Sequence, residues 1–380
     1  MASLNEIRVT ILADVPLWTL PGMEHLYRPG HYATWIESLI PAFAASRELD
    51  IHWICMSQQA DKPLTHEAHN QTFHILPRSK KSFSMVTAYL SETRRITTLI
   101  NHIRPTLIHA WGSEDVYGLA AARSKFEKRL FTLQGCLSDY LKLLGGGFLF
   151  RLQTLYEKHT IRRFQMGTAE SPSAADALKC IHPTMEIQLV DYGVNPDFFE
   201  AVWEPDAEPT VSFVGAVTRR KGIHDLVTLA GDPELQHIRF LILGDGDLMQ
   251  ELQQDSPDNV EWLGKCFRQK VIEVLARSWC LFIPTYADTG PTVIKEARVI
   301  GLPIITTNGA GASSYVTRHD SGHVTTPGDI HAMRRHLTEL CASREHCIEV
   351  GKRGHAKNRL QLSPSATAKA FAEIYKSMIN

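Results

Sequence analysis

The stretch from Pro284 to Ala297, PTYADTGPTVIKEA, says most about the fold of this chain. It follows a short apolar segment, passes through a turn at Gly290 and continues with helical spacing. The unpaired N–H groups and positive dipole end of such a helix start suit a phosphate group. Asp288 precedes this start and Glu296 follows it, and a carboxylate can accept two hydrogen bonds from the vicinal hydroxyls of a ribose. The stretch therefore predicts a strand, turn and helix that hold sugar, phosphate and ribose in order, although a capping Asp288 and a solvated Glu296 would also fit it.

The same alternation of strand and helix runs through the whole chain. Short apolar or β-branched runs indicate buried strands, and they are separated by segments of helical spacing such as 85–104. The predicted strands cover 7–13, 50–56, 73–76, 106–110, 130–133, 166–170, 187–190, 210–214, 240–243, 260–263, 281–284 and 303–306. This order is typical of an α/β fold with two doubly wound parallel sheets, which bind ligands beyond the carboxyl ends of their strands.

Length and a proline-rich break divide the chain into domains. A chain of 380 residues is too long for one typical core and fits two. The segment 195–209 carries three prolines and several acids, which indicates a linker. We therefore expect a Rossmann-like domain at 1–195, a second one at 196–362, and a C-terminal helix at 363–380 that begins at a Ser-Pro cap.

Composition and charge exclude several classes of protein. Hydrophobic residues make up 44% of the chain and charged residues 21%, as in ordinary globular proteins. The net charge of −1 provides no overall field for nucleic acid, so no nucleic-acid partner is expected. Seven cysteines without a CxxC pair indicate reduced thiols rather than a disulfide framework or a zinc site. No signal peptide or transmembrane helix is evident, and we expect a cytoplasmic protein.

Together with the residues that follow it, the opening stretch resembles a known family motif. Pro284-Thr285, Glu296-Ala297, Gly301-Leu-Pro303 and Gly309-Ala-Gly311 stand in the order and spacing of the Glu-x7-Glu region of the retaining GT-B glycosyltransferases of family 4. Asp288 occupies the place of the first Glu, so the side chain there is shorter by one methylene. The combination is specific, whereas a lone acidic pair would not be.

The resemblance covers nearly the whole chain, is strongest over 210–311 and is poor over 137–165. It implies the GT-B fold, in which two Rossmann-like domains face a cleft and the C-terminal helix crosses back to the first domain. It also implies that 1–195 is the acceptor side and that 196–362 binds the nucleotide-sugar donor.

The resemblance assigns roles around the motif. The position of Asp288 contacts the donor sugar near the reacting carbon, which makes Asp288 the predicted catalytic residue. The position of Glu296 binds the ribose, and the backbone N–H groups near Thr292 and Val293, after Gly290, bind the diphosphate.

A basic cluster, TRRK at 218–221, follows the strand at 210–214. Cations there would neutralise the charge that builds on a leaving nucleoside diphosphate. Lys221 matches the family pattern, but Ala216 stands where the family has an Arg. We expect Arg219 or Arg220 to reach in instead, or the site to work with less charge. A solvated basic turn is the alternative.

The loop after the strand at 260–263 contains the predicted nucleobase site. In the resembled family this loop meets the base through backbone groups, which makes Lys265, Cys266 and Phe267 the candidates. The Gly-x-Gly at 244–246 permits a tight turn near the ligand and, without a third glycine at the required spacing, is weak as a dinucleotide site.

Three positions of the first half are candidates as well. The resemblance places Gly30 where a helix start approaches the donor phosphate, although a plain turn glycine would also fit. Gln134 replaces a family His near the sugar, and an amide can position a ligand but cannot titrate. His109 ends a predicted strand and is expected either to face the sugar or to be a satisfied core histidine.

The expected reaction is retaining transfer of a sugar to an acceptor hydroxyl of a glycan, lipid-linked or small-molecule acceptor. Retention comes from the resemblance alone. No Asp-x-Asp motif is convincing, so we expect no metal and no cofactor. Two alternatives remain: a nucleotide-sugar epimerase of GT-B fold, and a nucleotide-sugar-binding protein with impaired catalysis.

Peripheral contact with the inner face of a membrane is a further expectation. Arg78, Lys80, Lys81 and the amphipathic segment 148–164 would rest on anionic lipid. Solvated faces of the first domain are the alternative.

Overall fold

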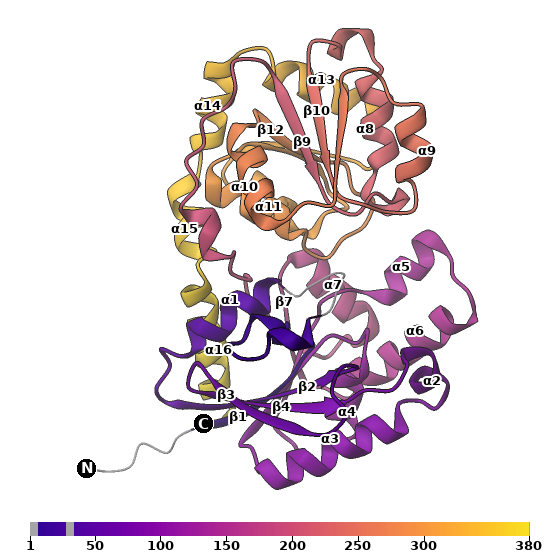
Figure 1. The fold of residues 1–380 in the computed structure, drawn as a ribbon, viewed down its shortest axis with the longest axis vertical. Coiled ribbons are helices and arrows are strands. Elements are labelled where there is room, and N and C mark those ends of the chain that lie inside the picture. Colours follow the sequence, from indigo (N-terminus) through magenta and orange to yellow (C-terminus); the bar gives the residue numbers. More distant parts are fainter. Residues whose placement is uncertain (1–6, 28–33, 380) are drawn as a thin grey trace. The chain divides into compact units, whose positions relative to one another are not determined.

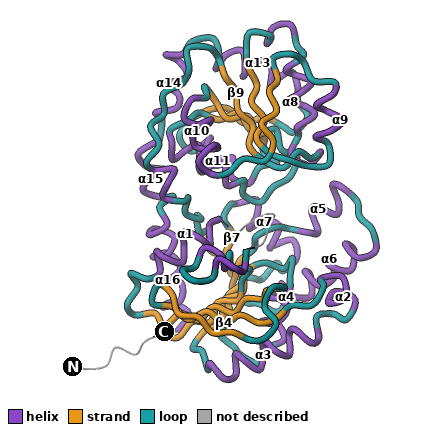
Figure 2. The backbone as a smooth tube through the Cα atoms, viewed as in Figure 1, coloured by secondary structure: helices purple, strands orange, loops and turns teal. Residues whose placement is uncertain are grey.

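The computed structural model describes residues 7–27 and 34–379. The chain forms two compact units, one made of Met1–Gly193 with Pro364–Asn380 and the other of Val194–Ser363. Each unit is a mainly parallel sheet flanked by helices (Figure 1), so the predicted class of two Rossmann-like α/β domains is confirmed. The strands and helices alternate along the chain in both units (Figure 2). None of the described helices is both long and apolar enough to span a bilayer.

The first unit contains a sheet in the order β3-β4-β2-β1-β5-β6-β7-β8 among the described residues. All neighbours are parallel except β3 and β4, an antiparallel pair that was not predicted from the sequence. The strands are β1 (Ile7–Leu12), β2 (Leu49–Ser57), β3 (Leu64–Ala68), β4 (Gln71–Pro77), β5 (Leu107–Trp111), β6 (Arg129–Thr132), β7 (Met166–Ala169) and β8 (Glu186–Leu189).

Helices cover both faces of this sheet. Because side chains alternate along a strand, Trp53 and Cys55 join one buried cluster, whereas Ile54 and Met56 join the other. The first cluster includes side chains from α1 and α16, and Phe43 of α1 stacks with Tyr375 of α16. The helices of this unit are α1 (Thr34–Phe43), α2 (Lys81–Val86), α3 (Leu90–Ile103), α4 (Val116–Arg123), α5 (Leu137–Leu144), α6 (Phe148–Ile161), α7 (Pro172–Ile181) and α16 (Pro364–Ile379).

One predicted helix is wrong in detail. The segment 85–104 was expected to be continuous, but α2 ends at Val86 and α3 begins at Leu90. Ala88 and Tyr89 both adopt left-handed backbone angles, with φ of 52° and 54°. An α-helix cannot continue through such residues, so the chain turns between the two helices.

The second unit contains an all-parallel sheet in the order β11-β10-β9-β12-β13-β14 among the described residues. Its strands are β9 (Thr210–Val214), β10 (Arg239–Leu243), β11 (Val260–Gly264), β12 (Cys280–Ile283), β13 (Ile304–Thr307) and β14 (Gly322–Thr325). Its helices are α8 (Ile223–Ala230), α9 (Met249–Gln254), α10 (Arg268–Arg277), α11 (Thr292–Ile300), α12 (Ser314–Thr317), α13 (Ile330–Leu340), α14 (Arg344–Lys352) and α15 (His355–Gln361).

The chain order reverses between β9 and β12 in the second unit and between β1 and β5 in the first. The connections that leave two such neighbouring strands run in opposite directions, which opens a crevice at their carboxyl ends. Each unit therefore has one position where its topology favours a ligand.

Candidate functional site

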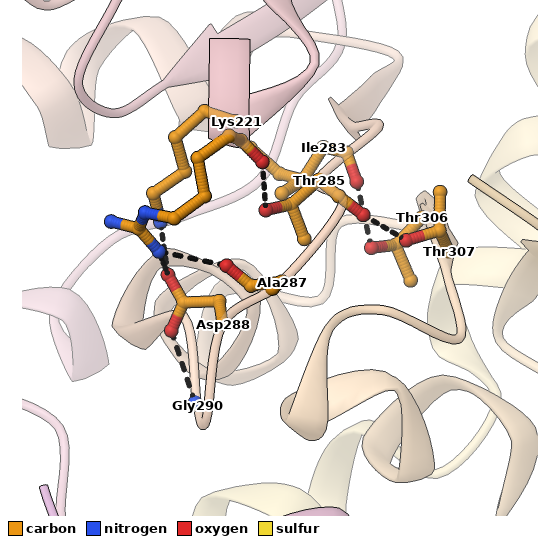
Figure 3. Close-up of polar contacts among 9 residues, drawn as sticks. Lys221, Ile283, Thr285, Ala287, Asp288, Gly290, Thr306 and Thr307 are labelled. Atoms are coloured by element: carbon orange, nitrogen blue, oxygen red, sulfur yellow. Dashed lines mark hydrogen bonds and ion pairs between the residues drawn. The ribbon is translucent and has the colours of Figure 1, made fainter. Parts of the chain in front are cut away.

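In the second unit, hydrogen bonds join the loops that leave β9, β12 and β13. The carbonyl of Arg220 accepts from the N–H of Tyr286 at 2.8 Å and from the hydroxyl of Thr285 at 3.0 Å. The hydroxyl of Thr307 donates to the Thr285 carbonyl (Figure 3). The N–H of Asp288 donates to the Gly309 carbonyl at 2.9 Å. The loops at the switch point thus form one connected backbone framework.

This framework depends on glycines at the close approaches. Gly222 has φ +71°, and a Cβ there would lie 1.9 Å from the carbonyl oxygen of Pro284. Gly244 has φ +153°, and a Cβ there would lie 1.8 Å from the carbonyl oxygen of Gly215. Glycine is required at both positions because any side chain would push the loops apart.

Asp288 is the acidic residue around which the charged side chains of the site gather. Its carboxylate forms ion pairs with Lys221 and with Arg220, whose Nη1 lies 3.3 Å from Oδ2, and it accepts the N–H of Gly290 at 3.1 Å (Figure 3). Arg220 also donates to the carbonyl of Ala287 at 2.8 Å. Burial opposes ionisation of Asp288, but the two cations and the Gly290 hydrogen bond outweigh it, so the pKa of Asp288 lies below its usual range.

The two candidate arginines of the basic turn lie in different surroundings. Arg220 and Lys221 reach Asp288, whereas Arg219 is exposed. Gly290 lies in the same cluster, but its N–H points to Asp288 rather than standing open. The arrangement places two basic side chains and one carboxylate together at the carboxyl edge of the sheet.

Helix α11 begins directly after this cluster. Its N-cap is Pro291, whose side chain makes no capping hydrogen bond, and the N–H groups of Thr292 and Val293 belong to its first turn, where a ligand can accept from them. Glu296 is half-buried one turn later. Burial raises the pKa of Glu296 to about 7, although Lys295 and Arg268 oppose the increase.

The predicted base-site residues lie in the loop between β11 and α10, at the carboxyl end of a strand two places from β9. Phe267 is 87% exposed and Lys265 is also exposed. Cys266 is half-buried, and its thiol lies 3.5 Å from the Gly264 carbonyl oxygen. An exposed aromatic ring offers a surface on which a nucleobase can stack.

In the first unit, the prediction for His109 as a ligand-facing residue is corrected. Its side chain is fully buried, with Nδ1 2.7 Å from the Tyr375 hydroxyl and Nε2 2.6 Å from the Thr132 hydroxyl. Burial holds the pKa of His109 well below its ordinary value. It is the satisfied core histidine that the sequence left as the alternative. Gly30 lies outside the described residues.

Gln134 lies at the carboxyl end of β6, beside a residue that sequence analysis missed. A Cβ on Gly112 would lie 2.5 Å from Glu114 Oε2 and 2.7 Å from Gln134 Oε1, so the two side chains share one corner of the sheet edge. Burial, reinforced by the nearby Glu157, raises the pKa of Glu114 to about 7. Glu114 follows the predicted strand 106–110 much as Asp288 follows 281–284, and that signal could have identified it.

A cavity of about 270 Å³ opens at the switch point of the first unit. Its lining includes Asp14, Trp18, Gln59, Arg78 and Asp115. Arg78 forms an ion pair with Asp115, and its side chain is only 8% exposed. The expectation that Arg78 rests on a membrane is therefore wrong, because its charge is already buried and paired.

A larger hollow of the second unit, about 640 Å³, lies elsewhere. It is lined by residues that precede β9, such as Val202 and Asp206, and by Arg277 and Arg344. It contains none of the predicted site residues.

Comparison with known proteins agrees with this layout. Residues 28–164 match the family model described as glycosyl transferase 4-like, and residues 195–357 match the model described as glycosyl transferases group 1. A GDP-mannose-dependent alpha-mannosyltransferase of Mycobacterium tuberculosis is 23% identical over 342 residues, which cover 85% of each chain.

Solved structures share the fold at low sequence identity. Sucrose-phosphate synthase from Thermosynechococcus elongatus aligns with a TM-score of 0.78 at 17% identity, over 98% of this chain and 99% of its own. HepE from Anabaena in complex with UDP-glucose aligns with a TM-score of 0.71 at 14% identity, over 98% and 100%. Together with the two sheets, these likenesses establish the GT-B fold that the sequence predicted.

Proposed function

We propose that this chain, which the family models and relatives support as a GT-B glycosyltransferase, transfers a sugar from a nucleotide-sugar to an acceptor hydroxyl with retention and without a metal ion. The observation that carries the proposal is the cluster of Arg220, Lys221 and Asp288 at the β9–β12 switch point. Two cations beside a helix N-terminus favour a diphosphate, and an adjacent carboxylate favours sugar hydroxyls.

The proposed mechanism assigns charge neutralisation to the chain's own groups. Lys221, Arg220 and the N–H groups of α11 would stabilise the negative charge that develops on the leaving diphosphate oxygen. As in the resembled family, the donor phosphate would accept the acceptor's proton. Asp288, held ionised, would orient the donor sugar and stabilise the positive charge that develops on its ring.

A donor screen tests this proposal. GDP-mannose and UDP-glucose head the list of donors, because one relative is GDP-mannose-dependent and the HepE structure contains UDP-glucose. We expect one of the UDP-, GDP-, ADP- or TDP-sugars to raise the melting temperature of the wild type and to have less effect on Lys221→Met. The product formed with an acceptor should keep the anomeric configuration of the donor by NMR. An inverted product, or no stabilisation by any nucleotide sugar, would contradict the proposal.

The same experiment separates the two alternatives. An epimerase would change the donor without any acceptor, which product analysis in the absence of acceptor detects. A binding protein without catalysis would show the thermal shift but not even slow hydrolysis of the donor.

The proposed acceptor site is the cavity at the β1–β5 switch point. Carboxylates such as Asp14 and the ring of Trp18 can contact a polyhydroxylated acceptor by hydrogen bonds and stacking. Replacement of Trp18 by Ala should raise the KM for the acceptor and leave donor affinity unchanged. Equal effects on both would argue against this assignment.

The proposal includes a lipid-facing surface at the tip of the α5–α6 pair. Leu144 is 52% exposed and Phe148 is 76% exposed, and the three glycines between them are exposed too. Helix α6 departs from the usual burial pattern of an amphipathic helix, because polar residues such as Gln153 and Glu157 are buried while Phe148 is exposed. The exposed bases Lys142 and Arg151 flank this tip, which suits an anionic bilayer.

Vesicle binding tests this surface. The wild type should sediment with vesicles that contain anionic phosphatidylglycerol, and Phe148→Glu should reduce that binding. Leu360→Glu is the matched control, since Leu360 is 77% exposed on α15 of the second unit. Binding of Phe148→Glu at the wild-type level would remove the tip from the proposal.

A further inference from the structure

Two histidines and a glutamate converge where α13 packs against the edge strand β14. His323 lies on β14, and His336 and Glu339 lie three residues apart on one face of α13. One ligand atom from each residue lies within 4.8 Å of the other two. None of the three belongs to the proposed donor site, and each lies near the helix–strand contact rather than at the carboxyl edge of β9 or β12.

The distances within this triad are too long for good hydrogen bonds. Oε2 of Glu339 lies 3.8 Å from Nε2 of His323 and 3.5 Å from Nδ1 of His336. Hydrogen bonds of this kind are normally about 2.7–3.2 Å long. Two ligands of one tetrahedral zinc ion, each about 2.0–2.2 Å from the metal, are separated by roughly 3.3–3.5 Å. The observed separations are closer to this second value.

The two ring nitrogens that face Glu339 also lack a hydrogen-bond partner among the described residues. Nε2 of His323 and Nδ1 of His336 are buried atoms without a hydrogen bond. The two rings stack with centroids 4.0 Å apart and planes inclined by 14°. A single divalent ion would bind both nitrogens and the carboxylate once the two rings tilt out of this stack, because an imidazole binds a metal in the plane of its own ring.

A second histidine pair shows the contrast. In the first unit, Nδ1 of His52 lies 3.0 Å from Nε2 of His74, and Nε2 of His52 lies 3.2 Å from Oδ1 of Asp50. These are hydrogen-bond distances, so the facing atoms of that group already satisfy one another. The His323 group differs because its facing atoms do not.

We propose that His323, His336 and Glu339 bind a zinc ion that ties α13 to β14. Two imidazole nitrogens and one carboxylate form a set that zinc accepts, whereas magnesium and calcium prefer oxygen ligands alone. Glu339 is 51% exposed, which leaves the fourth position to water. The ion would stabilise β14, which in the described part of the chain is an edge strand paired with β13, and this role is separate from the proposed transfer reaction.

Cobalt is the direct probe, because tetrahedral Co²⁺ absorbs visible light and occupies zinc sites. The full chain, with any histidine tag removed and stripped by chelator, is titrated with Co²⁺ and then with Zn²⁺. We expect one Co²⁺ per chain with a tetrahedral spectrum that Zn²⁺ abolishes, and a higher melting temperature with Zn²⁺ that chelator reverses.

Variants locate the site. His336→Ala and the nearly isosteric Glu339→Gln should weaken Co²⁺ binding by about 100-fold or more, since even the loss of residues behind the direct ligands typically costs 10–100-fold. His74→Ala, which removes one histidine of the satisfied pair, should bind as the wild type does. The proposal is overturned if the wild type shows no tetrahedral spectrum, or if Glu339→Gln keeps wild-type affinity and Zn²⁺ stabilisation.

Discussion

Donor binding should depend on pH through Glu296. The pKa of this half-buried carboxyl is raised to about 7, chiefly by burial. If Glu296 binds the ribose as an ionised acceptor of two hydrogen bonds, donor affinity follows its ionised fraction. With a pKa of about 7, that fraction falls from about 90% at pH 8 to about 1% at pH 5. The donor dissociation constant should therefore rise by close to two orders of magnitude, or about 2.7 kcal/mol, as the pH falls over this range.

Isothermal titration calorimetry with the identified nucleotide-sugar at pH 5, 6, 7 and 8 measures this dependence directly. A nucleotide-sugar is the right ligand because its bridging diphosphate does not titrate in this range. Asp288 should contribute little to the profile, because its pKa is lowered rather than raised. Glu296→Gln should bind more weakly than the wild type at pH 8 and should flatten the profile.

Glu251→Gln is the matched control, since Glu251 is exposed on α9 and belongs to no proposed contact. It should keep the wild-type profile. The reasoning fails if the wild type binds equally well from pH 5 to pH 8, or if Glu296→Gln shows the same slope as the wild type.

The raised pKa also affects stability without ligand. The folded chain holds the Glu296 proton more tightly than the unfolded chain, whose carboxyl titrates near 4.5. This tighter proton binding adds to the free energy of unfolding. The added stability is fully present below about pH 4.5 and is lost as the pH rises through about 7. In urea unfolding, the free energy of unfolding of the wild type should fall more steeply between those pH values than that of Glu296→Gln.

Four further changes test the site and its framework. Asp288→Asn should lower kcat by about 10²–10³-fold, in line with the loss of one preorganised electrostatic contact, and unchanged turnover in steady-state kinetics would remove its role. Lys221→Met should weaken donor binding by about 1.5–3 kcal/mol in calorimetry, the usual value of a charged hydrogen bond. Gly222→Ala should destabilise the fold by about 3 kcal/mol in urea unfolding, because the added Cβ meets the Pro284 carbonyl, and a neutral result would show that the loop can yield. Arg298→Met should lower the free energy of unfolding by a similar amount, about 2–4 kcal/mol, because the fully buried guanidinium donates to carbonyls of Leu302, Gly351 and Arg353. A wild-type melting temperature in this variant would contradict the prediction.

The predicted elements were accurate where local pattern alone decides structure. The strand at 210–214 is β9 to the residue, and the turn and helix of the opening stretch follow β12 as expected. A run of buried β-branched residues before a glycine turn and an apolar helix leaves few other conformations open. The break at Ala88 and Tyr89 was missed, because neither residue type favours a left-handed backbone and no local signal marks it.

By itself, the sequence determined the α/β alternation, the place of Asp288 and Glu296 around one helix start, and the basic turn nearby, because neighbours in the chain set these features. Only the tertiary structure decided which arginine reaches Asp288, since Arg219 and Arg220 have the same side chain. The hydrogen bonds that the Arg220 carbonyl accepts from the loop after β12 fix the conformation of the turn. It also buried His109 against Tyr375, which lies 266 residues away, and brought His323 to the face of α13 that carries Glu339. Such contacts depend on which surfaces pack together, and residue spacing along a single segment does not contain that information.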